Sequence, residues 1–404
     1  MAQGQREIAV VGVGGTTYHP RGIVGHSAVS YHAEAAALAI EDAGLSKRDI
    51  DGILVCEHSE DVKIAYRVFE NLGMSGRAKP LCLAITNGGI AAAVANKVAT
   101  WALLSGEANY VLVVGGGGGA RGRASERATR PGAYMQGQHH FSWEFDVIYG
   151  PLGAPGFYAL HAQRHMHEYG TKPEHLAAVK VASSKHGALY PKTLLPQVVT
   201  IDDVLNSRYV AAPFHILDCC YPTGRGSDAY ILTTAERARD LKHPPVWMLG
   251  VGQYHAGYHV GALCTGWEDG HDLIRTNGRE AADQAFGEAG VTRADIDFAE
   301  LYDSFTMTVL MQLEDFGFCE KGESGPFAEG GRLELGGELP VNTNGGMLNL
   351  GQTGVGSTVM FQTEAVEQLR HEAGPRQVRD AKLAVVGSVS GPMSNYGCTI
   401  LAQD

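Results

Sequence analysis

The stretch 39–51, Ala-Ile-Glu-Asp-Ala-Gly-Leu-Ser-Lys-Arg-Asp-Ile-Asp, recurs at 285–297 as Ala-Phe-Gly-Glu-Ala-Gly-Val-Thr-Arg-Ala-Asp-Ile-Asp. The offset is 246 residues, and six of the thirteen positions are identical. Each copy is typical of the end of an amphipathic helix, a glycine C-cap at Gly44 or Gly290, and a short turn into a buried strand. The repeat therefore predicts that one α/β unit occurs twice in the chain.

Two further echoes extend the repeat in the same chain order. Val113-Val114-Gly115 is echoed by Val385-Val386-Gly387, and Asn87-Gly88-Gly89 is echoed by Asn344-Gly345-Gly346. Their offsets, 272 and 257 residues, differ from the first, as insertions in surface loops produce at little cost in stability. Three echoes in one order favour duplication over chance.

Apolar runs and turn residues divide the rest of the chain into elements and parts. Residues 120–240 lose the alternation of strand and helix and are rich in His, Tyr, Pro and Arg, which predicts an inserted loop domain. We expect three parts: a first half over 1–119, a loop domain with the return to the first half over 120–240, and a second half over 241–404. The expected strands are 8–14, 52–55, 110–114, 214–217, 298–302, 383–386 and 397–402, and the expected helices are 27–42, 273–289 and 363–371.

Composition limits the classes of function. The 404 residues include 44% hydrophobic and 19% charged side chains and 53 glycines, which suits a compact α/β protein with tight turns. A net charge of −12 argues against general affinity for nucleic acid or an anionic membrane, because both need a cationic face. One basic run, at Arg121, Arg123, Arg127 and Arg130, is either a solvated loop or a contact for phosphates of a nucleotide-like ligand.

The cysteines and the N-terminus indicate the cellular compartment. None of the seven cysteines forms a C-x-x-C pattern, and only Cys219 and Cys220 are adjacent, so neither a disulfide framework nor zinc-site spacing is present. The first residues lack an apolar signal core, and no run approaches ~18 uncharged apolar residues. We expect a cytoplasmic protein that does not enter a membrane.

Two other patterns are typical of ligand sites but lack a required part. The glycines at 12–15 and 115–119 follow buried strands, yet the acidic residue that holds a ribose is missing, so we interpret them as packing turns rather than a dinucleotide site. A histidine-rich stretch provides i, i+4 spacing but no fourth ligand, which favours polar contacts or pocket lining over a metal; its members are His139, His140, His161, His165 and His167.

Four motifs, together with the duplicated halves and the insertion, resemble the thiolase superfamily. The likeness is strongest to sterol-carrier-protein-type thiolases and their steroid side-chain aldolase relatives. It implies an α/β thiolase fold of five layers, αβαβα. It also implies coenzyme A as part of the substrate with no separately bound cofactor, a homodimer through the first half, and a zinc-ribbon/OB-fold companion protein in a heterotetramer. The motifs are 217–220 (Leu-Asp-Cys-Cys), 300–306 (Glu-Leu-Tyr-Asp-Ser-Phe-Thr), 313–319 (Leu-Glu-Asp-Phe-Gly-Phe-Cys) and 342–346 (Asn-Thr-Asn-Gly-Gly).

The reactive cysteines of thiolases have no counterpart in this alignment. The acyl-accepting position corresponds to Ile85, which cannot form a thioester, and Cys82 lies three residues earlier on a strand. The loop 387–393 carries no cysteine, and Cys398 lies in the following strand, where we expect a core position. Cys219 and Cys220 are either buried structural residues or a substitute nucleophile; we favour the structural role.

The acid/base histidines are replaced as well. The family's histidine in the 302–305 motif is Tyr302, and its Gly-His-Pro loop is Gly-Gln-Thr-Gly at 351–354, without the second tyrosine of the aldolases. Tyr302 is our candidate base, because it resembles the tyrosine of the steroid aldolases. A free phenol titrates near pH 10, so nearby donors or a cation must favour its phenolate. The alternative is a packed tyrosine whose hydroxyl is satisfied by backbone.

What remains is a scaffold that binds a thioester and stabilises its enolate. Side-chain amides of Asn344 or Gln352 and backbone amides of the glycine loops are candidate donors to the thioester oxygen. This chemistry suits retro-aldol cleavage of a bulky β-hydroxyacyl-CoA, such as a steroid side chain, without a covalent intermediate. The alternatives are an atypical thiolase or acyltransferase acting on a β-ketoacyl-CoA, and a non-catalytic acyl-CoA or lipid-binding subunit. The candidate substrate-binding residues are Asn87, Gly88, Gly345, Gly346 and Gly391.

Overall fold

The computed structural model of this chain describes residues 6–20, 26–57, 63–76, 81–118, 149–150, 153–221, 224–257 and 272–403. The basic run at 121–130 and the histidines at 139 and 140 lie outside these ranges. No helix in the described ranges combines the length and the apolar character needed to span a membrane.

Nine strands of the described residues hydrogen-bond in the order β3-β2-β4-β7-β1-β8-β11-β10-β9. Outward from the centre, β1 is antiparallel to β7, β7 is antiparallel to β4, and β4 is parallel to β2. On the other side, β8, β11, β10 and β9 repeat the same orientations. This matched order confirms the duplication. The strands are β1 Ile8–Gly15, β2 Gly52–Cys56, β3 Leu81–Ile85, β4 Tyr110–Gly116, β7 Ser227–Thr234, β8 Val246–His255, β9 Phe298–Glu300, β10 Leu383–Ser390 and β11 Asn395–Ala402.

The equivalent of β3 is reduced in the second half. There, a parallel bridge between Ala299 and Val341 takes the place of the five-residue pairing between β2 and β3. A Gly-Gly turn follows in both halves, at 88–89 before α3 (Ala91–Leu104) and at 345–346, where α14 (Gly346–Leu350) begins. The two Asn-Gly-Gly motifs are therefore equivalent in space as well as in sequence.

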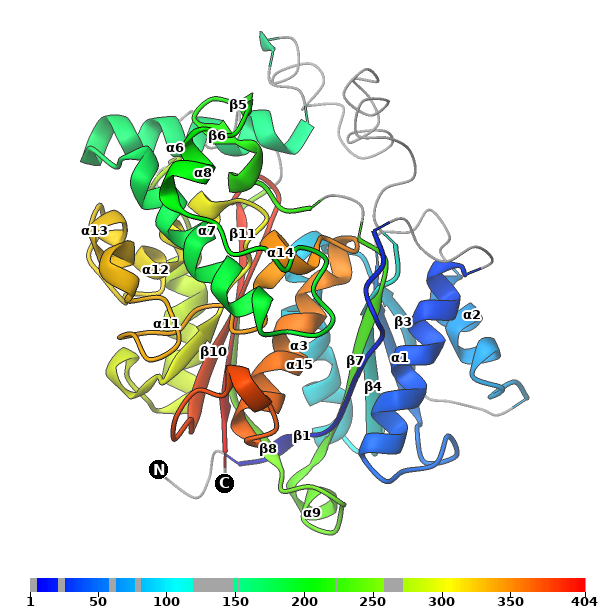
Figure 1. Cartoon of the computed structure of the whole chain (residues 1–404). Helices are drawn as coiled ribbons and strands as arrows, with labels where there is room; N and C mark the ends of the chain where they lie inside the picture. The colour runs from blue at the N-terminus through cyan, green and yellow to red at the C-terminus, as the bar shows by residue number, and fades with distance from the viewer. Residues whose placement is uncertain are drawn as a thin grey trace.

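Helices cover both faces of each half and fill the space between the halves (Figure 1). Helices α3 and α15 (Val359–Leu369) contact strands of both halves and form the central layer. Helices α1 (Ala28–Asp42) and α2 (Ile64–Asn71) cover one outer face, and α11 (Gly278–Ala289) and α12 (Thr306–Asp315) lie on the other. The result is the expected succession of helix, sheet, helix, sheet and helix.

The repeated helices α1 and α11 dock closely on their strands. A Cβ added at Gly12 of β1 would lie 2.7 Å from the Cβ of Ala43, so glycine is needed for this approach. Gly44 and Gly290 have φ of +69° and +65°, the left-handed conformation of a helix C-cap. Gly290 is the C-cap of α11, as predicted, whereas the C-cap of α1 is Ala43 and Gly44 follows it.

The insertion between β4 and β7 is largely helical where it is described. Helix α7 (Pro173–Ala188) packs on α12, on α13 (Ser324–Ala328) and on α14, so the insertion covers the second half (Figure 1). The part boundaries at 119 and 240 remain a prediction. The insertion also contains α6 (Gly153–Tyr169), α8 (Ile201–Leu205), β5 (Tyr209–Ala211) and β6 (Phe214–His215), and α9 (Ala235–Ala238) follows β7.

Most expected elements differ in their bounds by a few residues, and three of these differences are instructive. The predicted helix 273–289 begins only at Gly278, because the amides of Ile274 and Arg275 donate to Asp272 Oδ1 (2.8 and 2.9 Å) in a turn. The predicted helix 363–371 spans 359–369. The predicted strand 214–217 ends at residue 215, since Ile216–Asp218 forms a 3-10 turn.

Candidate active site

Tyr302 lies where three distant segments meet. It follows β9, and its side chain is 6% exposed. A Cβ added at Gly89 would lie 2.8 Å from the Tyr302 ring and would overlap the carbonyl oxygen of Val389. One added at Gly88, whose φ is +66°, would overlap the hydroxyl of Ser390. The glycines of the first half therefore let the Asn-Gly-Gly loop pack directly on Tyr302 and on the end of β10.

The side-chain amide of Gln352 links the phenol to a thiol. Gln352 Nε2 donates to the Tyr302 hydroxyl at 3.3 Å, and Cys220 Sγ lies 3.8 Å from Gln352 Oε1. The Gln352 backbone amide donates to the carbonyl oxygen of Tyr221 (2.8 Å), which fixes the two loops to each other. The structure thus brings Tyr302, Gln352 and Gly88 together, and it adds Gly89 and Cys220.

Backbone bonds fix the position of Tyr302. Its amide donates to the carbonyl oxygen of Gly387 (3.2 Å). Its own carbonyl oxygen accepts from Thr308 Oγ1 (2.8 Å) and Gln312 Nε2 (2.7 Å). Because the hydroxyl accepts from a side-chain amide of a separate loop, the contact with Gln352 is built by the fold rather than by the local chain.

The thiols near the site are not activated. Burial raises the pKa of Cys220 to about 12, with the nearby charge of Asp303 adding to the shift and that of Lys180 opposing it. Cys219 Sγ donates to the carbonyl oxygen of His215 (3.4 Å), and burial raises its pKa as well. Cys398 is fully buried in β11, as expected for a core residue. A protonated, buried thiol is a poor nucleophile.

Asp303, next to the phenol in sequence, is directed at a helix N-terminus. Its carboxylate accepts from the amides of Met347 (2.8 Å) and Leu348 (3.3 Å) at the start of α14. Burial raises the pKa of Asp303 to about 7, and these bonds and the charge of Lys180 limit the rise. The side chain therefore caps α14 and joins the two halves of the site.

Lys180 on α7 is a buried cation beside the site that the sequence did not reveal. Its Nζ donates to the carbonyl oxygen of Leu348 (2.9 Å) and to Asn349 Oδ1 (2.7 Å). Burial lowers its pKa to about 8, while Asp303 and Cys220 lie close enough to oppose the shift. A lysine within a helix is ordinarily solvent-exposed, so only the packing of α7 on α14 identifies it.

The second Asn-Gly-Gly loop differs from expectation. The amide of Gly345 donates to the carbonyl oxygen of Asn342 (2.8 Å), and that of Gly346 donates to Asn344 Oδ1 (2.8 Å). The expectation that these two amides donate to a thioester is therefore corrected, since both already have partners inside the loop. Gly345 instead permits close packing: a Cβ there would lie 2.6 Å from Gly187 Cα. Asn344 is buried, and only its NH₂ group is left to donate elsewhere.

The remaining candidates border the site. Asn87 has an exposed side chain and precedes the 3-10 turn Gly88–Ile90, which leads directly into α3. The first amides of a helix lack intrahelical partners and favour negative charge, so this end of α3 suits an oxyanion. Gly391 has φ of +61°, and its carbonyl oxygen accepts from the Tyr158 hydroxyl of α6 (2.6 Å).

Two of the three histidines of α6, His161 and His165, make polar contacts within the protein. His161 Nδ1 lies 2.6 Å from the carbonyl oxygen of Leu273. The ring of His165 contacts Thr171 Oγ1 (2.7 Å) and Glu314 Oε1 (2.9 Å), and His167 is exposed. Within the described ranges no group of three or more His, Cys, Asp or Glu side chains could hold a metal ion.

Comparisons with known proteins agree with this architecture. Residues 266–403 match the family model "Thiolase C-terminal domain-like". A steroid side-chain-cleaving aldolase of Thermomonospora curvata is 34% identical over 351 residues, 84% of this chain and 85% of that protein. An acetyl-CoA acetyltransferase of Methanothermobacter thermautotrophicus is 32% identical over 400 residues, 96% and 97% of the two chains.

A solved structure extends the likeness to three dimensions. The Ltp2-ChsH2(DUF35) aldolase superposes with a TM-score of 0.85 at 30% identity, covering 98% of each chain. The aligned region includes both Asn-Gly-Gly loops and Tyr302, which follows β9. This protein belongs to the thiolase superfamily, as a sterol-carrier-protein-type member close to the steroid side-chain aldolases.

Proposed function

We propose that this protein is a carbon–carbon lyase that cleaves a bulky β-hydroxyacyl-CoA by a retro-aldol reaction. The observation that carries the proposal is the 3.3 Å contact between Gln352 and the Tyr302 hydroxyl, in a site whose thiol, Cys220, has a pKa of about 12. Among the residues that the structure describes, the site has a candidate proton acceptor and no activated thiol. The name of the steroid side-chain-cleaving aldolase, which is 34% identical, supports the same reaction class.

In the proposed reaction the Tyr302 oxygen takes the proton of the substrate's β-hydroxyl group. The Cα–Cβ bond breaks, the β-carbon leaves as a ketone or aldehyde, and the electron pair moves into the thioester as an enolate. The α-carbon then gains a proton, which gives a shortened acyl-CoA. Donation from Gln352 Nε2 to the phenol oxygen favours the phenolate. The N-terminal turn of α3, which contacts the Tyr302 ring through Gly89, favours the enolate charge.

A thiolase or acyltransferase reaction is the second candidate, favoured by the 32% identity to an acetyl-CoA acetyltransferase over 96% of this chain. That chemistry needs a thiolate at the start of the first glycine loop. The residue there is Ile85, which is 7% exposed, and the thiol of Cys220 is held in its protonated form. We therefore rank the lyase first and a non-catalytic acyl-CoA-binding subunit third.

We also propose a homodimer, a companion protein and a cytoplasmic location. Strand β3 is the outer strand of the first half, and large apolar side chains near it are exposed, which supports dimerisation there: Leu83 (44%), Trp101 (62%) and Leu104 (52%). A zinc-ribbon/OB-fold companion is proposed because the aldolase structure that this chain resembles names a DUF35 component. A steroid side chain is proposed as the acyl group from the name of the Thermomonospora curvata aldolase. Free thiols in the described chain fit a reducing compartment.

Tyr302→Phe tests the function. We expect kcat for cleavage of a β-hydroxyacyl-CoA to fall by about 10²–10⁴, the usual contribution of a general base. Affinity for the acyl-CoA, measured by calorimetry, should persist because the phenyl ring keeps the packing. Tyr66→Phe, on the exposed face of α2, is the matched control and should leave kcat unchanged.

Unchanged turnover in Tyr302→Phe would remove this residue from the mechanism. Binding without turnover in the wild type, with any co-purifying partner present, would favour the non-catalytic subunit. Thiol alkylation separates the transferase, because a cysteine-dependent enzyme loses activity and the proposed lyase does not.

A further inference from the structure

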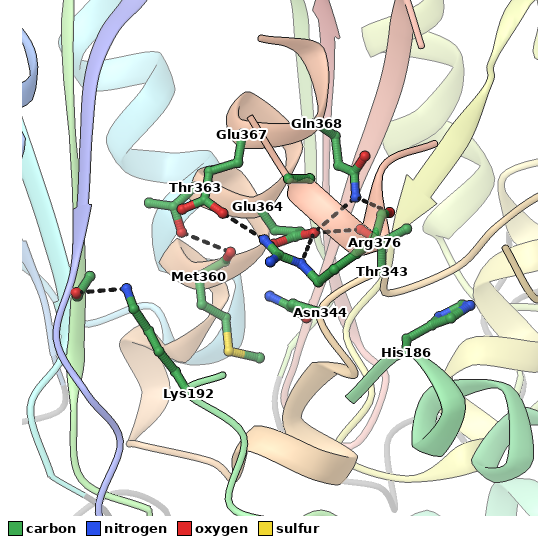
Figure 2. Close-up of polar contacts among 12 residues, drawn as sticks. His186, Lys192, Thr343, Asn344, Met360, Thr363, Glu364, Glu367, Gln368 and Arg376 are labelled. Carbon is green, nitrogen blue, oxygen red and sulfur yellow. Dashed lines mark hydrogen bonds and ion pairs between the residues drawn. The ribbon is translucent and has the colours of Figure 1, made fainter. Parts of the chain in front are cut away.

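Two buried glutamates share one threonine hydroxyl behind the site. Glu300, the last residue of β9, is fully buried two positions before Tyr302. Thr343 Oγ1 lies 2.7 Å from Glu300 Oε1 and also 2.7 Å from Glu364 Oε1 of α15. The Thr343 backbone amide donates to Glu300 Oε1 (3.0 Å). Figure 2 shows Thr343 and Glu364 in this cluster, with Asn344 beside them.

The hydrogens available do not satisfy two ionised carboxylates. A threonine hydroxyl has one hydrogen to donate, and an ionised carboxylate can only accept. If both glutamates were charged, the single hydroxyl hydrogen could serve only one of them. The other 2.7 Å contact would then bring two buried oxygen atoms together with no hydrogen between them. One of the two carboxyl groups must therefore carry a proton and donate it to Thr343 Oγ1.

The surroundings decide which glutamate is protonated. Arg376 donates to Glu364 through Nε (3.1 Å) and Nη2 (2.8 Å), and the same Nη2 contacts Glu367 (2.6 Å) (Figure 2). Gln368 Nε2 also donates to Glu364 Oε1 (3.1 Å). Since a guanidinium stays charged in proteins, Glu364 is the ionised member of the pair.

Glu300 lacks such compensation. Its Oε2 is buried without a hydrogen-bond partner among the described residues. Burial, followed by the negative charges of Glu364 and Asp303, raises the pKa of Glu300 well above its usual range, while its hydrogen bonds with Thr343 oppose the rise. A neutral acid satisfies this environment, whereas a charged one leaves an uncompensated buried anion.

We propose that Glu300 is a positioning residue, held as a neutral carboxylic acid that donates to Thr343 Oγ1 and fixes the loop 342–346 against β9. The neighbouring bonds define what it fixes. The Asn342 side chain accepts from the Leu301 amide (2.6 Å) and donates to the Leu301 carbonyl oxygen (2.9 Å). The Asn342 amide donates to the carbonyl oxygen of Ala299 (2.9 Å). Together with the Glu300–Thr343 bonds, they hold the three residues that precede Tyr302.

This role has a defined pH dependence. A carboxyl group whose pKa is raised in the folded state stabilises the fold below its unfolded pKa, and this contribution is lost as the pH rises through the folded pKa. Ionisation of Glu300 would put a second negative charge beside Glu364, with one hydroxyl hydrogen between them. We expect the loop 342–346 to loosen at that point, with a decline in kcat that Glu300→Gln, which cannot ionise, does not share.

Infrared difference spectroscopy tests the proton directly. The spectrum of the wild type minus that of Glu300→Gln should contain the C=O stretch of a protonated carboxylic acid, shifted in D₂O. Glu288→Gln, which alters an exposed glutamate paired with Lys97, is the control and should leave that band in place. If this difference spectrum contains only bands of an ionised carboxylate, Glu300 is charged in the wild type and the proposal is wrong.

Hydrogen exchange and kinetics test the positioning role, whose catalytic consequence rests on the proposed function. Glu300→Gln keeps a donor for Thr343 Oγ1 but loses the acceptor for the Thr343 amide, so it should retain slower amide exchange at 342–346 and a higher kcat than Glu300→Ala. Glu300→Ala should exchange faster there and lose about 100-fold in kcat, as a misplacement of about 1 Å does. Equal exchange in the two variants would overturn the role. A wild type that shows the acid band and the exchange difference, yet cleaves no β-hydroxyacyl-CoA, would instead refute the proposed function.

Discussion

Gly89→Ala should disable the site without replacing any group that takes part in the chemistry. Gly89 lies in the turn before α3, where its backbone touches both Tyr302 and the end of β10. An added Cβ would lie 2.8 Å from the Tyr302 ring and would overlap the carbonyl oxygen of Val389. An ordinary contact between carbon atoms is about 3.5–4.0 Å, so the ring or the turn must move by roughly 1 Å.

The expected loss in activity follows from that displacement. A 1 Å misplacement of a catalytic group costs about 10²-fold in rate, and overpacking of this kind costs about 1–3 kcal/mol in the free energy of unfolding. We therefore expect Gly89→Ala to fold, with a lower denaturation midpoint, and to lose about two orders of magnitude in kcat for β-hydroxyacyl-CoA cleavage.

The control is Gly287→Ala on α11. An added Cβ there meets nothing within 4 Å, and the helix interior favours alanine by about 0.5–1 kcal/mol. This variant should unfold at slightly higher denaturant and keep wild-type kcat. Both are measured by urea unfolding and by steady-state kinetics on one substrate. If Gly89→Ala keeps wild-type kcat, the close contact between the first glycine loop and Tyr302 plays no part in catalysis, and the reasoning fails.

Three further outcomes test the charges and thiols around the site. Cys220→Ala should keep turnover, because a thiol with a pKa of about 12 is protonated at neutral pH; abolished turnover in steady-state assays would contradict this. Lys180 has a pKa of about 8 when folded and 10.5 when free, so the unfolded state binds more protons between these values. The wild type should therefore gain up to about 3 kcal/mol of stability from pH 8 to 10.5 relative to Lys180→Met, whereas parallel urea-unfolding curves would refute the shift. Arg376→Met leaves Glu364 buried without its cation, and urea unfolding should detect a loss of about 3–5 kcal/mol, against less than about 1 kcal/mol for Lys185→Met, which removes a more exposed ion pair with Glu334.

The architecture was predictable because duplication leaves local signals. The helix end, the glycine and the turn that leads into the strand lie within thirteen residues in each copy. This repeated local pattern corresponds to a repeated strand order, β1-β7-β4-β2 in the first half and β8-β11-β10-β9 in the second. The helix 273–289 was predicted too long because its apolar pattern continues through a turn that Asp272 stabilises. A side-chain-to-backbone bond of this kind competes with the helix and is not visible in hydrophobic periodicity.

The site was predictable only in part. Tyr302 and Gln352 follow from motif positions, and the fold places them in contact. The contact of Cys220 with Gln352 joins residues 132 positions apart, and the burial of Lys180 depends on packing between α7 and α14. Neither the Cys220–Gln352 contact nor the burial of Lys180 can be predicted from residue spacing along the chain. The amides of Gly345 and Gly346 were misjudged for a related reason, since their partners are set by the turn geometry rather than by the Gly-Gly sequence.

The most direct test is product analysis with matched substrates. The purified protein, with any co-purifying partner, is incubated with a β-hydroxyacyl-CoA and, separately, with the corresponding β-ketoacyl-CoA plus free CoA, and the products are identified by mass spectrometry. The account predicts that the hydroxy substrate yields a ketone or aldehyde and a shortened acyl-CoA without any need for free CoA. Cleavage of the keto substrate alone, dependent on free CoA, would contradict it and would require a nucleophile other than the protonated thiol of Cys220.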